Sequence, residues 1–215
     1  MRMPGEQELL AAAEPVFSDG ERVLFGELME FVSRRLEGAE ESGRRILHGG
    51  PTPESATERE LHAFLRDCWD ALDGLGRLIN VALAGAFPDV GLYPSDRMTR
   101  QCTLYTVRRA LRADPDAACH PVSEWLWAET RDRPDAAYER LSFLHNLSVF
   151  VPLRLTRDGM LPGCEDVPPA VRRLVRPCSV QRCSVGEGVA DVLEWLRGFA
   201  GRCCELLAES LRERG

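Results

Sequence analysis

The chain has 215 residues, of which 44% are hydrophobic and 28% charged, and its net charge at pH 7 is −7. These values are ordinary for a soluble globular protein with a sizeable core. The acidic balance argues against a protein whose whole surface contacts nucleic acid, although it leaves room for a small basic site.

The N-terminus lacks the apolar segment of a signal peptide, and no run approaches the roughly 18 apolar residues of a membrane span. We therefore expect an intracellular, cytoplasmic protein that does not associate with membranes. In that compartment the eight cysteines should be mostly reduced.

Two long helices are predicted in the first half of the chain. Ser18 and Glu21 have the spacing of a capping box, and the apolar residues after them recur with helical period to about Leu47. Glycine and proline residues then end this helix. Ser55 and Glu58 form a second capping box, which opens another helix with a long apolar stripe. Two long helices joined by a short turn predict an antiparallel hairpin.

Further helices follow along the chain. The pattern predicts them over 97–112 and 123–130, from near Pro134 to near Pro152, and, most clearly, along the stripe 189–211. No segment shows the alternation of a β-strand. The sequence thus predicts an all-α fold, a compact bundle of five to seven helices built on the long N-terminal hairpin.

The expected organisation has four contiguous parts. The loop among them is the segment best suited to partner contacts, because loops carry many binding residues. The parts are an N-terminal tail at 1–17, a helical bundle at 18–155, a proline-rich loop at 156–186, and a C-terminal helix at 187–215 that packs on the same bundle.

Polar residues recur on one face of the second predicted helix. Alternating charge on one helix face is typical of a solvated surface with pairs one turn apart. Alternatively, the face lines a polar cleft together with residues of a later helix. The cleft candidates are Asp70, Asp73, Arg77, Asn80, Tyr138 and Asn146.

Metal and cofactor motifs are missing from the sequence. Structural zinc sites commonly use two tight ligand pairs, whereas Cys178 and Cys183 are separated by four residues and no Cys-x-x-Cys pair occurs. The Glu-x-x-His pairs of di-metal bundles and the glycine-rich loops that bind phosphate are also missing. The sequence therefore predicts neither a bound metal nor a cofactor.

Two stretches are basic. The first, "DRMTRQCTLYTVRRALR", has five arginines and one aspartate, and the second, "AVRRLVRPCSVQRC", has four arginines and no acid. They either contact phosphate or balance acidic helices within the fold or on a partner. The candidate anion or RNA contacts are Arg100, Arg108, Arg109, Arg172 and Arg173.

The stretch "ERLSFLHN" places Arg140 and His145 on one predicted helix with four residues between them. This spacing resembles the HEPN superfamily of helical domains, whose signature is Arg, four to six residues, then His. Many members are metal-independent endoribonucleases. The resemblance implies that His145 acts as a general acid or base, and that Arg140 stabilises charge on a phosphate, commonly in a dimer cleft.

The resemblance covers this motif and the all-α plan. Leu141 stands where nuclease members usually have a polar residue. Residues five apart also lie about 140° apart around an α-helix, so the two side chains would need reach or distortion to converge. The other interpretation is that His145 caps or hydrogen-bonds within the bundle, and that Arg140 pairs with Glu139 or with a carboxylate of a neighbouring helix.

Two functional interpretations remain. The first is a non-enzymatic helical interaction or regulatory protein, whose partner is another protein or a second copy of this chain. The alternative is a HEPN-like endoribonuclease, or an inactive member of that fold, with RNA as its partner. The sequence favours the first, since the Arg–His motif has low specificity.

Overall fold

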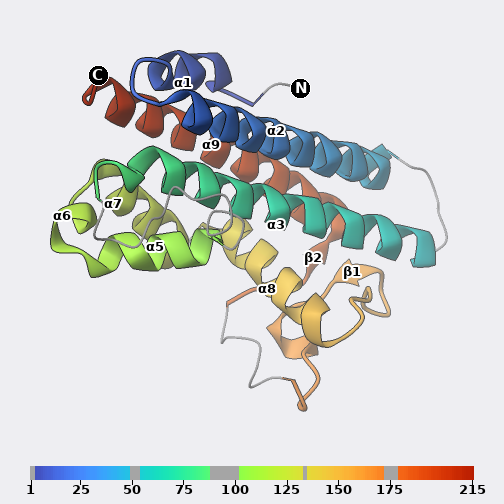
Figure 1. Ribbon diagram of the computed structural model, residues 1–215. Coiled ribbons are helices and arrows are strands. Elements are labelled where there is room, and N and C mark those ends of the chain that lie inside the picture. Colours follow the sequence, from blue (N-terminus) through green and yellow to red (C-terminus); the bar gives the residue numbers. More distant parts are fainter. Residues whose placement is uncertain (1–2, 49–53, 88–101, 133–134, 172–178) are drawn as a thin grey trace. The chain divides into compact units, whose positions relative to one another are not determined.

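The described part of the chain is all-α, as predicted. Its longest elements are α2 (Asp19–His48), α3 (Glu54–Ala84) and α9 (Val185–Arg212). Helices α2 and α3 run antiparallel and form the predicted hairpin (Figure 1). The computed structural model describes residues 3–48, 54–87, 102–132, 135–171 and 179–215.

Apart from a π-helical turn at Ala128–Asp132 and a 3-10 turn at Cys164–Asp166, the other described elements are shorter helices and a small β-ladder. They are α1 (Glu6–Ala13), α5 (Leu104–Ala113), α6 (Pro115–Ala118), α7 (Pro121–Trp127), α8 (Ala136–Phe150), β1 (Met160–Leu161) and β2 (Cys183–Ser184). The described residues thus contain eight α-helices, against the five to seven expected. Helix α1 and the four-residue α6 are too short to show a helical period.

The first 17 residues contain a helix, although we expected a tail. In α1, Leu9 and two alanines are buried. The helix begins after Gly5, which has a φ of 76° and where a Cβ would lie only 3.0 Å from the Cβ of Cys204. A close approach and a positive φ both require glycine at this position. The segment is therefore fixed against α9.

The chain folds as two compact units, each discontinuous in sequence. Helices α2, α3 and α9 each contribute residues to both units, so the units do not coincide with the contiguous parts expected from sequence. The first unit comprises Met1–Leu36, Asp70–Arg133 and Arg197–Gly215, and the second comprises Glu37–Trp69 and Pro134–Leu196.

The core of the first unit follows the predicted apolar stripes. In α2, Phe25, Met29 and Val32 are each at most 1% exposed, at the spacing of one helix face. Burying a side chain of this kind contributes about 1.5–3 kcal/mol. Their buried neighbours in the same unit include Leu75, Ile79, Leu83, Leu111, Leu126, Phe199, Cys203 and Leu207.

The second unit has its own core and the only sheet pairing among the described residues. Met160 pairs with Ser184, and Leu161 with Cys183, in an antiparallel ladder. The ladder was not predicted, because two-residue strands are too short to show alternation. The core consists of buried residues of α3, α8 and α9, including Leu61, Phe64, Cys68, Leu141, Leu144, Leu147, Val189, Val192 and Leu196.

The capping residues agree only in part with the sequence. The backbone N–H of Ser18 donates to the carboxylate of Glu21 (2.9 Å), which is one half of a capping box, and the Ser18 hydroxyl donates to the same carboxylate (2.6 Å). Helix α3 already includes Ser55, and the carboxylate of Glu58 instead accepts the backbone N–H of Leu155 (3.1 Å). Glu58 thus binds a distant segment, and the side chain of Ser55 in the second expected box lies outside the described part.

Two other helix starts differ from expectation. Helix α9 opens with a capping box that we did not predict, in which Ser184 and Glu187 exchange hydrogen bonds. Helix α5 begins at Leu104 and is capped by Thr103, several residues after the expected start at Arg97. Residues 88–101 lie outside the described part, and so does Pro134.

Candidate functional site

The candidate site lies in the second unit, where α8 ends. The helix stops at Phe150, and Val151 has an extended backbone (φ −141°, ψ 150°). Pro152 is the cause, because proline disfavours the helical conformation in the residue before it. The chain then leaves α8 without forming another α-helix before β1.

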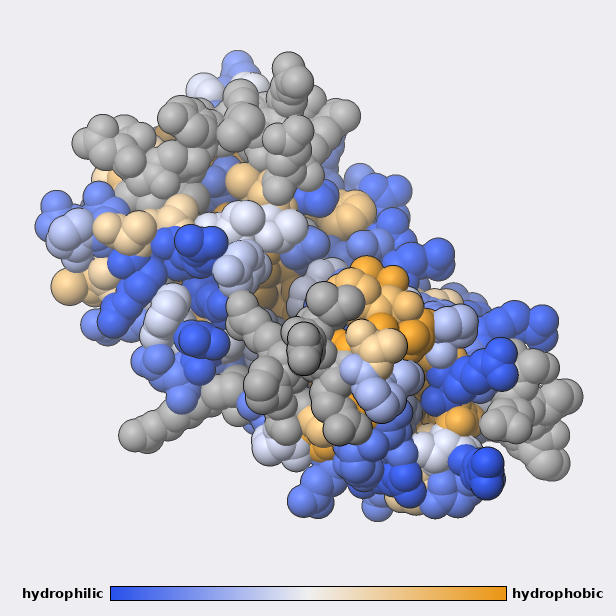
Figure 2. Space-filling model, turned by 90° about the horizontal axis from the view of Figure 1, so that it is seen from below, coloured by the Kyte–Doolittle hydropathy of each residue, from blue (hydrophilic) through white to orange (hydrophobic). Residues whose placement is uncertain are grey.

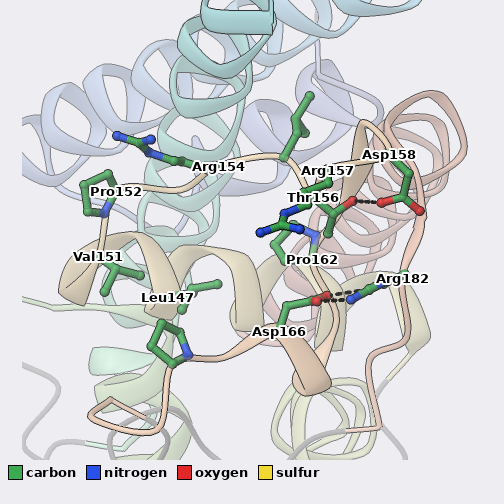
Figure 3. A pocket seen from close by; sticks show the side chains of 12 residues that line it. Leu147, Val151, Pro152, Arg154, Thr156, Arg157, Asp158, Pro162, Asp166 and Arg182 are labelled. Carbon is green, nitrogen blue, oxygen red and sulfur yellow. Dashed lines mark hydrogen bonds and ion pairs between the residues drawn. The ribbon is translucent and has the colours of Figure 1, made fainter.

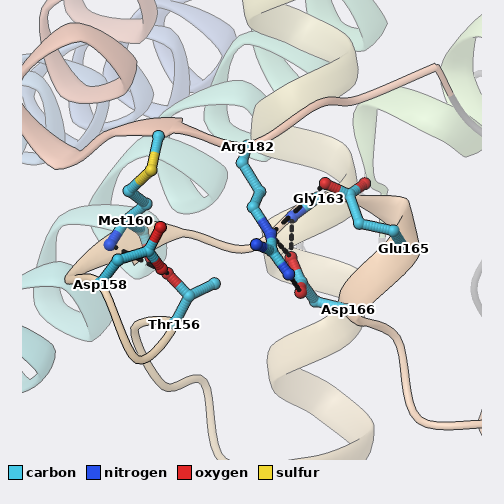
Figure 4. A network of polar contacts seen from close by, with 7 residues as sticks. All are labelled: Thr156, Asp158, Met160, Gly163, Glu165, Asp166 and Arg182. Carbon is cyan, nitrogen blue, oxygen red and sulfur yellow. Dashed lines mark hydrogen bonds and ion pairs between the residues drawn. The ribbon is translucent and has the colours of Figure 1, made fainter.

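A hydrogen-bonded turn follows. Gly159, with a φ of 74°, donates its N–H to the carbonyl oxygen of Thr156 (2.8 Å). The hydroxyl of Thr156 donates to Asp158 (2.6 Å) and accepts the N–H of Met160 (3.1 Å). Figure 4 shows the contacts of Thr156 with Asp158 and Met160, which stabilise this turn together with the Gly159 hydrogen bond.

The end of α8 and this loop enclose a cavity of about 530 Å³ (Figure 3). Its wall combines apolar side chains with several charged ones, which is the usual composition of a binding pocket. The apolar residues are Leu147, Val151, Pro152, Leu155, Pro162 and Pro168, and the polar residues are Arg154, Thr156, Arg157, Asp158, Asp166 and Arg182.

One of the cavity's arginines is neutralised within the loop. Arg182 forms an ion pair with Asp166, with its Nε 2.8 Å from a carboxylate oxygen, and its Nε also lies 3.4 Å from Glu165 (Figure 4). The hydrogen bond from Arg182 lowers the pKa of Asp166, and the hydrogen bond from Thr156 lowers that of Asp158. Both aspartates are therefore held ionised.

The other two arginines keep an unpaired charge. Arg154 and Arg157 are exposed, and neither forms an ion pair with any residue in the described part of the chain. A guanidinium group binds carboxylate or phosphate in a bidentate manner. The cavity can therefore accept an anionic group at its arginines beside its apolar wall.

Hydrophobic side chains adjoin the cavity on the surface. Val149 and Phe150, in the last turn of α8, are 65% and 44% exposed, and Val151 of the cavity wall follows directly. Figure 2 shows a face of the molecule on which hydrophobic residues gather among polar ones. Side chains of this kind, exposed together, are typical of interaction surfaces.

The cavity lining holds groups that can bind an anion and an apolar side chain. Of the twelve residues that line it in the described structure, none is histidine, cysteine or lysine. The two aspartates have lowered pKa values, so they are poor proton donors near neutral pH. The arrangement supports recognition of an apolar and acidic ligand.

Arg140 and His145 contact different helices. Arg140 forms an ion pair with Asp191 of α9 (2.9 Å), and its side chain is 17% exposed. The ring of His145 stacks on Trp69 of α3, with centroids 4.1 Å apart and planes inclined by 6°. Arg140 thus pairs with a neighbouring helix rather than with Glu139, which accepts a hydrogen bond from Ser179 (2.9 Å).

The polar face of α3 makes contacts in the first unit. Asp73 accepts the N–H of Leu104 (3.1 Å), and Arg77 donates to the carbonyl oxygen of Cys102 (3.3 Å). Burial raises the pKa of Asp73 despite this hydrogen bond. This part of the face holds the start of α5, is not fully solvated, and does not contribute to the cavity at the end of α8.

The remaining cleft candidates divide between the two units. Asp70 pairs with Arg35 (3.4 Å), and Asn80 is fully buried, both in the first unit. Tyr138 and Asn146 belong to the second unit. There the ring of Tyr138 lies 5.4 Å from that of Trp195, and Asn146 donates to Ser142 (3.4 Å).

Two of the five candidate anion contacts lie in the described part. Arg108 is buried and donates to the carbonyl oxygen of Thr130 (2.8 Å). Arg109 is exposed on α5. Three candidates fall outside the described residues, namely Arg100, Arg172 and Arg173.

The described cysteines are mostly free thiols, as expected, and Cys164 is the exception because it is disulfide-bonded. Six others in the described part are free thiols. The described residues contain no cluster of three or more His, Cys, Asp or Glu side chains able to hold a metal ion. Within the same residues, no helix is long and apolar enough to cross a membrane.

Sequence reasoning missed the cavity and the exposed end of α8. A usable signal was the excess of apolar residues in "LSFLHNLSVFV", since one buried helix face does not account for both Leu144 and Val149. Nothing in the sequence around Arg154 and Arg157 indicates that these arginines have no ion-pair partner in the described structure. Comparison with protein-family models, curated proteins and solved structures finds no match for the chain.

Proposed function

We propose that the chain is a non-enzymatic interaction protein that binds a protein partner at the end of α8. The observation that carries this proposal is the exposed pair Val149 and Phe150 beside the cavity, whose Arg154 and Arg157 have no ion-pair partner among the described residues. Burial of exposed apolar side chains drives most protein association. Each of these two side chains would contribute up to about 1.5–3 kcal/mol when fully covered.

The cavity defines what the partner must carry. An apolar side chain would fill the wall formed by Leu147, Val151 and Pro152, and a carboxylate would bind Arg154 or Arg157. Apolar anchors and arginines are frequent among residues that dominate binding energy. The expected partner therefore presents a hydrophobic residue next to an acidic one, on another protein or on a second copy of this chain.

The ribonuclease alternative has less support. A catalytic Arg–His pair must reach one phosphodiester, whereas Arg140 is paired with Asp191 and His145 is stacked on Trp69. Both contacts would have to break before the side chains could act together on RNA. The proposed interaction does not need free Arg140 or His145 side chains, so both contacts, which lie within the second unit, are compatible with it.

The test is a matched pair of aspartate substitutions. Val149→Asp places a charge at the proposed surface, and Val23→Asp does the same at a residue with nearly equal exposure, 65% against 63%. Proteins captured from a lysate by wild type would be identified by mass spectrometry, purified and titrated against each variant. We expect Val149→Asp to weaken binding by about tenfold or more, equivalent to 1.4 kcal/mol, and Val23→Asp to leave it unchanged.

A second variant tests the arginines. Arg154→Gln with Arg157→Gln should weaken binding of the same purified partner and reduce its salt dependence. Melting curves of every variant establish that the fold is kept. If Val149→Asp binds the partner as tightly as wild type does, the proposed binding surface is wrong. If wild type cleaves RNA in the presence of chelator, the ribonuclease alternative is favoured. Light scattering shows whether the partner is a second copy.

A further inference from the structure

Three arginines and two aromatic rings gather on α5 and α7 in the first unit. Tyr105, Arg109 and Arg112 are spaced by four and three residues, so they share one exposed face of α5. Arg108 lies beside them, and Trp127 ends α7. We call Arg108, Arg109 and Arg112 the α5 arginine cluster.

The guanidinium groups of the cluster lie over the two rings. Arg108 is 5.4 Å from the ring centre of Tyr105 and 5.6 Å from that of Trp127. Arg109 is 5.6 Å from the Tyr105 ring and Arg112 is 5.3 Å from the Trp127 ring. Cation–π contacts of this kind hold the arginines in place at little cost to their charge.

The charge of the cluster is not neutralised within the described structure. Arg108 is 6% exposed, and its Nη1 donates to the carbonyl and hydroxyl oxygens of Thr130, both neutral acceptors. Its Nε has no hydrogen-bond partner in the described part. None of the three arginines forms an ion pair with a described residue.

The carboxylate of Asp132 does not fill this role. It accepts the indole N–H of Trp127 at 2.5 Å, and no ion pair joins it to an arginine of the described chain. Two other exposed helical arginines of the first unit have carboxylate partners, Arg34 with Glu30 and Arg202 with Glu205. Among the described residues, no carboxylate therefore compensates the positive charge of the cluster, on a protein with a net charge of −7.

We propose that the α5 arginine cluster binds an acidic segment of a protein partner. Carboxylates are the complementary groups, because a guanidinium forms two parallel hydrogen bonds to a carboxylate. Arginine, tyrosine and tryptophan are the residues most enriched where binding energy concentrates, and here all three occur together on two helices. Charge complementarity also speeds and orients the encounter.

A protein segment fits the cluster better than single-stranded nucleic acid does. Proteins bind unpaired bases by stacking them on aromatic faces, whereas guanidinium groups already lie over Tyr105 and Trp127. The net charge of −7 repels an acidic peptide and an oligonucleotide of equal charge alike, so the preference for a peptide rests on the occupied aromatic faces and on carboxylate–guanidinium pairing.

The site is additional to the surface at the end of α8. It belongs to the other unit and rests on the arginines of α5, so it stands whether or not the α8 surface binds a partner. Acidic recognition at α5 would give the chain a second attachment point. Two such points on one chain allow it to join two partners, or to hold one partner by two segments.

Fluorescence anisotropy with a fluorescein-labelled hexaglutamate peptide tests the proposal on the full-length protein. Arg109→Glu with Arg112→Glu reverses two charges of the cluster at exposed positions. Arg34→Glu with Arg202→Glu is the matched control, with the same change in net charge at exposed helix positions of the same unit. Melting curves check that both variants remain folded.

We expect saturable, salt-sensitive binding of hexaglutamate by wild type and by the control variant, and at least a tenfold loss in the cluster variant. A labelled oligouridine of six nucleotides should bind more weakly than the peptide. No binding of hexaglutamate, or equal loss in both variants, overturns the proposal. Tighter binding of oligouridine that depends on Arg109 and Arg112 also overturns it, in favour of nucleic acid. If the cluster variant unfolds, Arg109→Gln with Arg112→Gln replaces it, with the same expected direction.

Discussion

The imidazole of His145 lies flat on the indole of Trp69, with ring centroids 4.1 Å apart and planes inclined by only 6°. The stack joins α8 to α3 within the second unit. Arg140, five residues earlier on α8, pairs instead with Asp191 of α9. The two residues of the Arg–His motif therefore connect α8 to two different helices, so each side chain has a structural role.

The stack predicts the effect of substituting His145. His145→Ala should lower the free energy of unfolding by about 1 kcal/mol, the usual contribution of an aromatic pair beyond its buried area. His145→Phe should retain most of the stability, because a phenyl ring can stack in the same place. Urea denaturation followed by circular dichroism measures both variants.

The same variants address the ribonuclease alternative. We expect no cleavage of single-stranded RNA by wild type in the presence of chelator. A wild type that cuts RNA, together with a stable His145→Ala variant that has lost two to four orders of magnitude in rate, would show that His145 is a catalytic acid or base. It would also replace the proposed interaction function.

The sequence predicted the elements that depend on local periodicity. Phe25, Met29 and Val32 recur at the spacing of one helix face, and a buried face requires that spacing. The candidate site depends on tertiary contacts instead. Arg182 is neutralised by Asp166, 16 residues away, while Arg154 and Arg157 have no such partner in the described structure. Nothing in the local sequence distinguishes these arginines.

Burial likewise distinguishes two predicted anion contacts that look alike in the sequence. Arg108 and Arg109 are adjacent and were predicted alike, yet Arg108 is buried against Thr130 and Arg109 is exposed. The difference follows from the packing of α5 beside the turn that contains Thr130. Helical position indicates which residues share a face, but it does not show how deeply a neighbouring segment covers that face.

Stability should fall on mild acidification because of His120. Burial lowers the pKa of His120 below its ordinary value of 6.5, and the charge of Glu213 opposes this to a smaller extent. The ring accepts the N–H of Val122 at Nδ1 (3.3 Å), so Nε2 carries the proton and donates to Ser210 (3.2 Å). Just below pH 6.5 the imidazole of His120 takes up a proton in the unfolded chain, whereas in the folded protein it stays neutral to lower pH. The free energy of unfolding therefore decreases as the pH falls from 6.5 towards the pKa of the folded state.

Urea denaturation at pH 8, 6.5 and 5 measures this dependence. His120→Asn keeps an acceptor at the start of α7 but does not titrate in this range. We expect the variant to lose less stability than wild type between pH 6.5 and 5. Equal losses in the two proteins would assign the acid sensitivity to other groups.

The cysteines should separate into three classes in a thiol titration. In denaturant, six of the eight should react without reduction, and all eight after reduction, because Cys164 is disulfide-bonded and six described cysteines are free. In the native protein the exposed Cys119 should react first. Burial raises the pKa of Cys204 to about 12 and that of Cys203 well above 9.0, so these thiols should react last. Eight reactive thiols before reduction would contradict the disulfide.

Two glycine substitutions should have opposite effects on stability. At Gly76 of α3, a Cβ would lie 2.7 Å from the backbone N and Cα of Leu104, where α5 begins. Backbone atoms held by the hydrogen bond from Leu104 to Asp73 have little room to move, so Gly76→Ala should destabilise by about 1–3 kcal/mol. Gly198 of α9 has no atom within 4 Å of the added Cβ, so Gly198→Ala should stabilise by about 0.5–1 kcal/mol through its better helix propensity. Urea denaturation of both variants gives the two free-energy changes on the same scale. If Gly76→Ala stabilises the protein, α3 and the start of α5 are not in such close contact. That result would also contradict the role of Asp73 in holding the start of α5.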